Sequence, residues 1–140
     1  MSIEKKQKDI IEEFQIFDDW MDKYAYLVDL GNELDSLNAD EKSDENLING
    51  CQSNVWIAAE LKDGKMHFKA DSDAIITKGI ASLLLRVFEN EKPEDIVDAD
   101  LHFIDEIGLH QHLSPTRSNG LLAMVKRIKA YALAYKSKNE

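Results

Sequence analysis

The stretch Asn54-Val55-Trp56-Ile57-Ala58-Ala59-Glu60-Leu61-Lys62-Asp63-Gly64-Lys65-Met66-His67-Phe68-Lys69-Ala70 decides the fold of this chain. Its first half is an apolar run that predicts a strand over 54–61. Asp63-Gly64 is typical of a two-residue hairpin turn, because both positions of a type I′ turn need a positive φ. Apolar and polar residues then alternate over 66–70, which is the pattern of a half-buried strand. The sequence therefore predicts an antiparallel hairpin with one buried face.

A polar loop precedes this hairpin and contains the only cysteine of the chain, Cys51. Gly50 frees the backbone just before the thiol, and the three residues after it are polar, which indicates a loop tip. A free cysteine is most often a small buried hydrophobe, but such a cysteine normally lies within an apolar periodic pattern. An unperturbed thiol, with a pKa of ~8.5, is only a few per cent ionised at neutral pH. A reactive Cys51 would therefore need a nearby cation, a loop amide or a partner's residues, and the residues alone leave both a reactive and an inert thiol open.

Helical patterns lie before the loop. Residues 3–17 place apolar side chains on one helical face, with Ser2 as the expected N-cap. A second helix is expected to begin after Asp18 or Asp19 and to break or end at Gly31. The polar residues 35–49 are then expected to form an irregular connection that leads to the loop with Cys51.

A further helix is expected over 74–90, immediately after the hairpin. Asp71-Ser72-Asp73 offers N-caps for it, and its apolar residues follow the helical period. Gly79 inside this helix costs up to ~1 kcal/mol relative to alanine. We therefore expect that another part of the molecule packs closely against Gly79, or that a functional group approaches the backbone there.

The last third of the chain mixes short elements with one long helix. Pro93 is expected to begin a helical turn over 93–97, and residues 99–104 are expected to form a short third strand. A short helical turn and a loop follow over 105–117. The final helix is expected from about Ser118 to Tyr135, with Lys126, Arg127 and Lys129 on its exposed side. The sum is an α+β fold of one domain, 1–140, in which helices cover a small antiparallel sheet of about three strands.

Composition excludes several classes of protein. The net charge is −10, and nucleic-acid binding normally requires clustered Lys and Arg, so we expect no nucleic-acid partner. No apolar run approaches the ~20 residues of a membrane-spanning helix, so we expect no membrane partner. The N-terminus leads into charged residues rather than an apolar segment, which indicates no signal peptide. A single cysteine forms no internal disulfide, and we expect a cytoplasmic protein.

Other side chains with catalytic potential form no recognisable site. The histidines are His67, His102, His110 and His112, and with one cysteine they make no zinc-binding spacing. A Cys–His hydrolase would need a histidine and a carboxylate beside Cys51, and no local signature supports one. Arg117 precedes the last helix and is either an ordinary surface arginine or a cation near the thiol or at a docking surface. No Gly-rich nucleotide-binding motif is present.

Four segments together resemble the SufE family. They are Gly50-Cys51-Gln52-Ser53-Asn54-Val55-Trp56, Asp71-Ser72-Asp73-Ala74-Ile75-Ile76-Thr77-Lys78-Gly79, Leu113-Ser114-Pro115-Thr116-Arg117-Ser118-Asn119-Gly120-Leu121, and Trp20-Met21-Asp22-Lys23-Tyr24 followed by Leu30-Gly31. They occur in the family's order, at compatible spacing, over nearly the whole chain. The resemblance implies an α+β fold similar to that of the scaffold protein IscU.

The resemblance also implies a function. SufE-family proteins accept sulfur from a PLP-dependent cysteine desulfurase of SufS type, stimulate that enzyme, and pass the sulfur to iron–sulfur cluster assembly on a scaffold complex of SufBCD type. The acceptor cysteine corresponds to Cys51, which would carry a persulfide, and the family needs no cofactor or metal of its own. No independent turnover is expected, and a homodimer is allowed. We further expect the loop 49–54 to move on binding, and Cys51 to be partly buried at rest against Trp56 or the 113–117 loop.

Three alternatives stand beside this interpretation. Gln52-Ser53 favours the SufE branch over the CsdE branch, whose members serve a different desulfurase. A metal- or cluster-binding scaffold module would share the IscU-like fold, but scaffolds of that type use several cysteines. If the chain were a Cys–His hydrolase, acyl electrophiles would react covalently with Cys51 and be turned over without any desulfurase.

Overall fold

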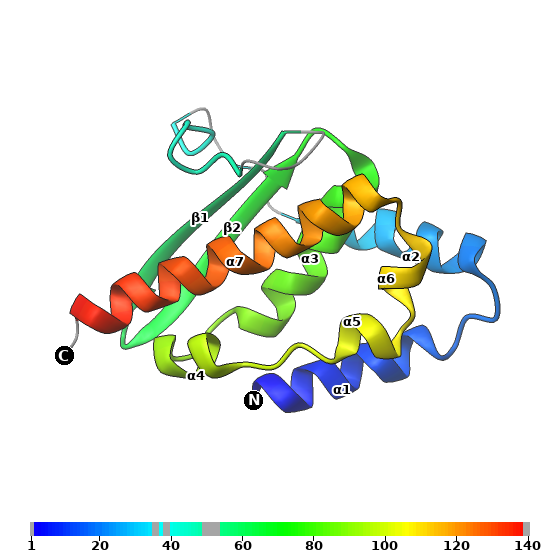
Figure 1. Cartoon of the computed structure of the whole chain (residues 1–140), viewed down its shortest axis with the longest axis horizontal. Helices are drawn as coiled ribbons and strands as arrows, with labels where there is room; N and C mark the ends of the chain where they lie inside the picture. Colours follow the sequence, from blue (N-terminus) through cyan, green and yellow to red (C-terminus); the bar gives the residue numbers. More distant parts are fainter. Residues whose placement is uncertain (1, 35–36, 38–39, 49–53, 139–140) are drawn as a thin grey trace.

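The computed structural model describes residues 2–34, 37, 40–48 and 54–138, and it has the α+β fold expected from the sequence. Figure 1 shows the hairpin along one side of the molecule, with the helices gathered against it. In chain order the elements are α1 (Ile3–Phe14), α2 (Trp20–Asn32), β1 (Val55–Lys62), β2 (Lys65–Ser72), α3 (Ile75–Phe88), α4 (Pro93–Asp98), α5 (Phe103–Glu106), α6 (Leu109–His112) and α7 (Pro115–Lys138).

The hairpin is confirmed. β1 and β2 pair in antiparallel register from Val55 opposite Ser72 to Lys62 opposite Lys65. The turn residues Asp63 and Gly64 have φ values of 55° and 79°, as a type I′ turn requires. The caps of the first two helices are confirmed as well, because the side chains of Ser2 and Asp19 accept hydrogen bonds from the first turns of α1 and α2.

One face of the hairpin forms the core with two helices. Alternate strand residues, such as Ile57 and Met66, are fully buried on this face. α3 packs against β2, α7 packs against β1, and α2 covers the far side of α3. The opposite face of the sheet carries mainly polar side chains, so the two-stranded sheet is half-solvated, as its alternating sequence predicted.

Both outer edges of the hairpin are occupied. On β2, the Met66 N–H donates to the Glu91 carbonyl at 2.8 Å, and the Phe68 N–H donates to the Glu89 carboxylate at 3.1 Å. On β1, the Ile57 N–H donates to the Asn46 carbonyl at 3.0 Å. Backbone groups of an edge strand cost free energy if they are buried without partners, and neighbouring segments satisfy the N–H groups of Met66, Phe68 and Ile57.

α2 and α3 approach each other closely at two glycines. A Cβ atom added to Gly79 would lie 2.2 Å from the Leu27 carbonyl oxygen, and one added to Gly31 would lie 2.8 Å from the Gly79 nitrogen. The close packing expected at Gly79 is therefore confirmed. Gly31, by contrast, does not break α2, which continues to Asn32, because the glycine serves the helix contact instead.

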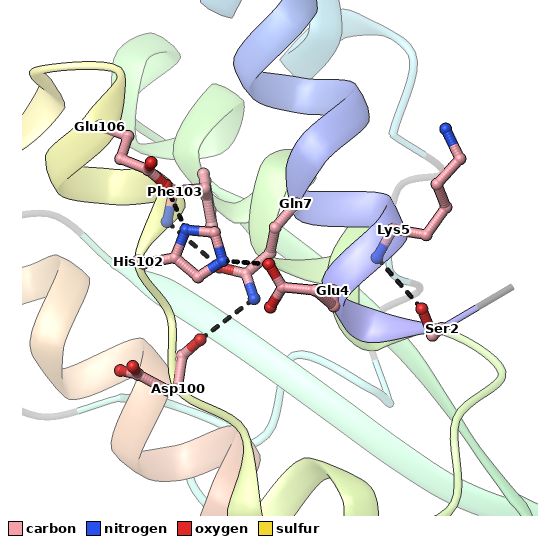
Figure 2. A network of polar contacts seen from close by, with 8 residues as sticks. All are labelled: Ser2, Glu4, Lys5, Gln7, Asp100, His102, Phe103 and Glu106. Atoms are coloured by element: carbon pink, nitrogen blue, oxygen red, sulfur yellow. Dashed lines mark hydrogen bonds and ion pairs between the residues drawn. The ribbon is translucent and has the colours of Figure 1, made fainter.

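The expected third strand over 99–104 is wrong, and the sheet has two strands in the described part of the chain. α5 begins at Phe103 within that range. Figure 2 shows the reason: the buried Gln7 side chain of α1 donates to the Asp100 carbonyl at 3.1 Å and accepts from the Phe103 N–H at 3.1 Å. One amide side chain thus satisfies the backbone that a neighbouring strand would otherwise have paired.

The same network includes a histidine between two carboxylates. His102 contacts Glu106 through Nδ1, and its Nε2 lies 2.6 Å from Glu4 Oε1 (Figure 2). The hydrogen bond to Glu106 raises the pKa of His102 above its usual value, and Glu4 adds to the effect. Both ring nitrogens of His102 therefore contact carboxylates, and the side chain links α1 to α5.

The long helix α7 begins at Pro115, three residues before the expected start.

Among the residues that the structure describes, no helix combines the length and the hydropathy that a membrane span requires.

Candidate functional site

The predicted acceptor, Cys51, lies in 49–53, outside the described residues. The structure does describe the chain on either side of it, and we call residues 46–48 and 54–57 the loop stems. These stems fix the positions of the two residues that flank 49–53, Ile48 and Asn54.

The two stems pair with each other in antiparallel fashion. The Ile48 N–H donates to the Val55 carbonyl at 2.8 Å, and a bridge joins Leu47 to Trp56. Ile48 and Val55 are both buried in the core. Because apolar burial and backbone hydrogen bonds act together here, both ends of the cysteine-bearing segment are held at one end of the hairpin.

α7 holds the upstream stem from the side. The Arg127 guanidinium donates to the carbonyls of Glu45 at 2.9 Å and Leu47 at 3.0 Å. One turn later, the Tyr131 hydroxyl lies 2.9 Å from the Ile57 carbonyl and 3.1 Å from Asn46 Oδ1. Arg127 and Tyr131 are four residues apart, so they lie on the same face of the helix, the face that runs along the edge of β1.

This arrangement corrects the expected exposure of two α7 cations. Arg127 and Lys129 are half-buried, and Lys129 donates to the Ala99 carbonyl at 2.6 Å. Both side chains donate to backbone carbonyls of irregular segments that pack on the helix. The helical period alone placed them with Lys126 on the solvent side, because it carries no information about which loops cover a helix.

Replacing Tyr131 by phenylalanine should destabilise the protein by about 1–2 kcal/mol, because it removes a part-buried hydroxyl whose one proton lies between two acceptors, the Ile57 carbonyl and Asn46 Oδ1. Urea unfolding measures the loss. Tyr24→Phe is the matched control, since the Tyr24 hydroxyl donates to the His112 carbonyl at an exposed position, where water can replace it, and its loss should cost less. An equal loss for the two variants would contradict a special role of Tyr131 at the stems.

The downstream stem is held by the segment Asp71-Ser72-Asp73. The Asn54 N–H donates to the Asp73 carboxylate at 3.1 Å. The Asn54 carbonyl accepts from the Ser72 hydroxyl at 2.9 Å and from the Asp73 N–H at 3.2 Å. Asn54 therefore has both backbone groups satisfied at the point where the described chain resumes after residue 53.

These contacts change the role expected for the three residues. The N-cap of α3 is Ala74, which makes no side-chain cap, and the Ala74 N–H donates to the Ser72 hydroxyl at 3.1 Å. Side chains that commonly cap helices are used here mainly to hold the neighbouring stem. The prediction that Asp71, Ser72 or Asp73 is the N-cap of this helix was therefore wrong.

A buried carboxylate with two partly exposed lysines lies beside the stems. The Asp71 carboxylate lies 3.3 Å from Lys42 Nζ and 3.4 Å from Lys78 Nζ, and it accepts from the Ser72 N–H at 2.8 Å. Burial opposes ionisation of Asp71, but the Ser72 N–H and the two lysines outweigh it and hold the pKa of Asp71 below its usual value. Lys42 also lies over the Trp56 ring, 5.4 Å from its centroid. The sequence did not predict this cluster. Its one indication in the sequence is Asp71, which continues the polar positions of β2.

The other candidates lie in separate surroundings. His112 stacks on Trp20 with 4.0 Å between ring centroids, and its backbone carbonyl accepts from the Tyr24 hydroxyl. His67 pairs with Glu89 at 3.2 Å. Arg117 is exposed in the first turn of α7, where its N–H donates to the Ser114 hydroxyl at 3.3 Å. In the described ranges, no group of three or more His, Cys, Asp or Glu side chains could hold a metal ion.

The chain is similar to known proteins both in sequence and in fold. The family model described as SufE, Fe-S metabolism associated domain, matches residues 8–132. The fold is similar to the solution structure of a hypothetical protein from Thermus thermophilus, with a TM-score of 0.78 and 22% sequence identity, covering 94% of this chain and 96% of that chain. At that identity the structural likeness establishes the shared fold alone.

Proposed function

The chain belongs to the SufE family and has a role in iron–sulfur metabolism, and from this premise we propose that it is a sulfur carrier with Cys51 as acceptor. The proposed donor is a PLP-dependent cysteine desulfurase of SufS type. The proposed recipient is an iron–sulfur scaffold complex of SufBCD type. The carrier stimulates the desulfurase by removing its product and has no turnover of its own.

The proposed transfer is a thiol–persulfide exchange. The Cys51 thiol loses its proton, and the thiolate attacks the terminal sulfur of the desulfurase persulfide. A new S–S bond forms on Cys51 while the S–S bond of the donor breaks, and the donor cysteine leaves as a thiolate. The sulfane sulfur moves without net oxidation or reduction, so the step requires no cofactor in this chain.

The observation that carries the proposal is the anchoring of both loop stems. Ile48 pairs with Val55, Arg127 holds the upstream stem, and the Asp71-Ser72-Asp73 segment holds Asn54. A carrier thiol must enter another protein's active site, which favours a short segment whose two ends are fixed to a rigid domain. The family match supports a role in iron–sulfur metabolism, and the anchored stems support a fixed base from which a thiol could be presented.

Intact mass measurement tests the proposal. After incubation with a SufS-type desulfurase and L-cysteine, the chain should gain the mass of one sulfur atom, about 32 Da, and a thiol reductant should remove it. Incubation without desulfurase is the control and should leave the mass unchanged. A parallel incubation with a CsdE-specific desulfurase decides the branch. An unchanged mass with both desulfurases would overturn the proposed function.

A further inference from the structure

Asp71 is the most informative charged group that the proposed chemistry does not use. It is 5% exposed, and it contacts lysines from two segments that are far apart in the sequence. Lys42 belongs to the segment that leads into the upstream stem, and Lys78 lies in the first two turns of α3. A buried carboxylate is costly unless it is paired, so this placement needs a reason.

The strand register explains why Asp71 reaches both lysines. Asp71 lies opposite Trp56 in the hairpin, whereas their neighbours Val55 and Ala70 are buried in the core. Alternation along a strand therefore directs Asp71 and Trp56 to the other face of the sheet. Lys42 lies on that face, in contact with the Asp71 carboxylate and over the Trp56 ring.

The residues after Asp71 make the link to the stems direct. Ser72 and Asp73 hold Asn54, and the Ser72 N–H itself donates to the Asp71 carboxylate. One short segment thus holds the downstream stem through the Ser72 hydroxyl and the Asp73 carboxylate and N–H, and it contacts the upstream segment through Lys42. Lys78 ties the same carboxylate to α3.

We propose that Asp71 is a positioning residue for sulfur transfer, because it holds the two stems of the cysteine-bearing loop in one arrangement through Lys42, Ser72 and Lys78. The inference rests on the proposed function of Cys51. Asp71 acts through the stems and takes no part in bond making. If the stems must be arranged before the partner binds, a smaller population of that arrangement weakens apparent binding and leaves the bound complex unchanged.

Desulfurase turnover at rising concentrations of this chain tests the inference. Asp71→Asn keeps the side-chain shape and removes the charge. We expect it to raise the KM for this chain at least about fivefold while kcat stays within about twofold, which is the signature of lost pre-arrangement. Asp71→Glu, which keeps the charge, should recover part of the KM. Lys42→Gln should raise the KM in the same direction, and its effect should not add fully to that of Asp71→Asn, because the two side chains form one contact.

Glu13→Gln is the matched control. Glu13 is also a paired carboxylate, held by Arg86 and Tyr26, but it joins α1 to α2 and α3. It should alter stability and leave the KM unchanged. A normal KM for Asp71→Asn, or an equal rise for Glu13→Gln, would overturn the positioning role while a wild-type mass gain of one sulfur leaves the proposed function intact. A wild-type chain that gains no sulfur would overturn both.

Discussion

Cys51→Ser should abolish sulfur loading completely. Serine has nearly the same size but presents a hydroxyl in place of the thiol, and a hydroxyl neither ionises near neutral pH nor exchanges with a persulfide. The variant should show no gain of mass with desulfurase and L-cysteine, and its stimulation of desulfurase turnover should fall to the level without any carrier. Intact mass and sulfide release measure the two effects in one reaction.

A displaced thiol provides the control for Cys51. The double variant Cys51→Ser, Ser53→Cys keeps one cysteine in the same loop, two residues further along the chain. If the stems present one particular position to the partner, this variant should load sulfur far more slowly than the wild type, by about tenfold or more. Equal stimulation by wild type and Cys51→Ser would show instead that the chain only activates the desulfurase allosterically.

Gly79→Ala should cost about 2 kcal/mol or more of folding stability. The new Cβ would lie 2.2 Å from the Leu27 carbonyl oxygen, which belongs to the backbone of α2 and yields only if the two helices separate. Overpacking of this kind typically costs about 1–3 kcal/mol, and sometimes more. Alanine recovers ~1 kcal/mol of helix propensity, which is too little to reverse the sign. Urea unfolding of both proteins gives the difference.

Gly64→Ala separates a steric clash from backbone strain. Gly64 has a φ of 79°, but a Cβ atom there would meet nothing within 4 Å. Its replacement should cost about 1 kcal/mol, from the left-handed conformation alone. The loss for Gly79→Ala should exceed that value. A stabilised Gly79→Ala would mean that α2 and α3 separate without cost and that the contact does not maintain the packing.

The parts of the fold that could be predicted from the sequence are those determined by neighbouring residues. Asp63-Gly64 specifies its own turn because two adjacent residues need a positive φ. Ser2 and Asp19 specify helix starts because a cap bonds within three residues. The α+β class followed from such local signals added together.

The errors arose where distant residues decide the structure. The pattern at 99–104 favoured a strand, but Gln7, more than 90 residues earlier in the chain, satisfies that backbone in an irregular form. Arg127 follows the polar phase of its helix, yet a loop that passes over α7 half-buries it. No local signal records which segment covers a helix. Cys51 stays a prediction from its motif, because it lies outside the described residues.

The occupied edges of the hairpin bear on how this protein behaves at high concentration. A two-stranded sheet with bare edges would invite strands from other copies to add on, the first step toward fibrils. Here Glu89 and Glu91 engage one edge, while Asn46 and Tyr131 engage the other. At Met66, Phe68 and Ile57 these contacts take up the backbone groups that a strand from another copy would need, so they oppose the addition of such a strand there.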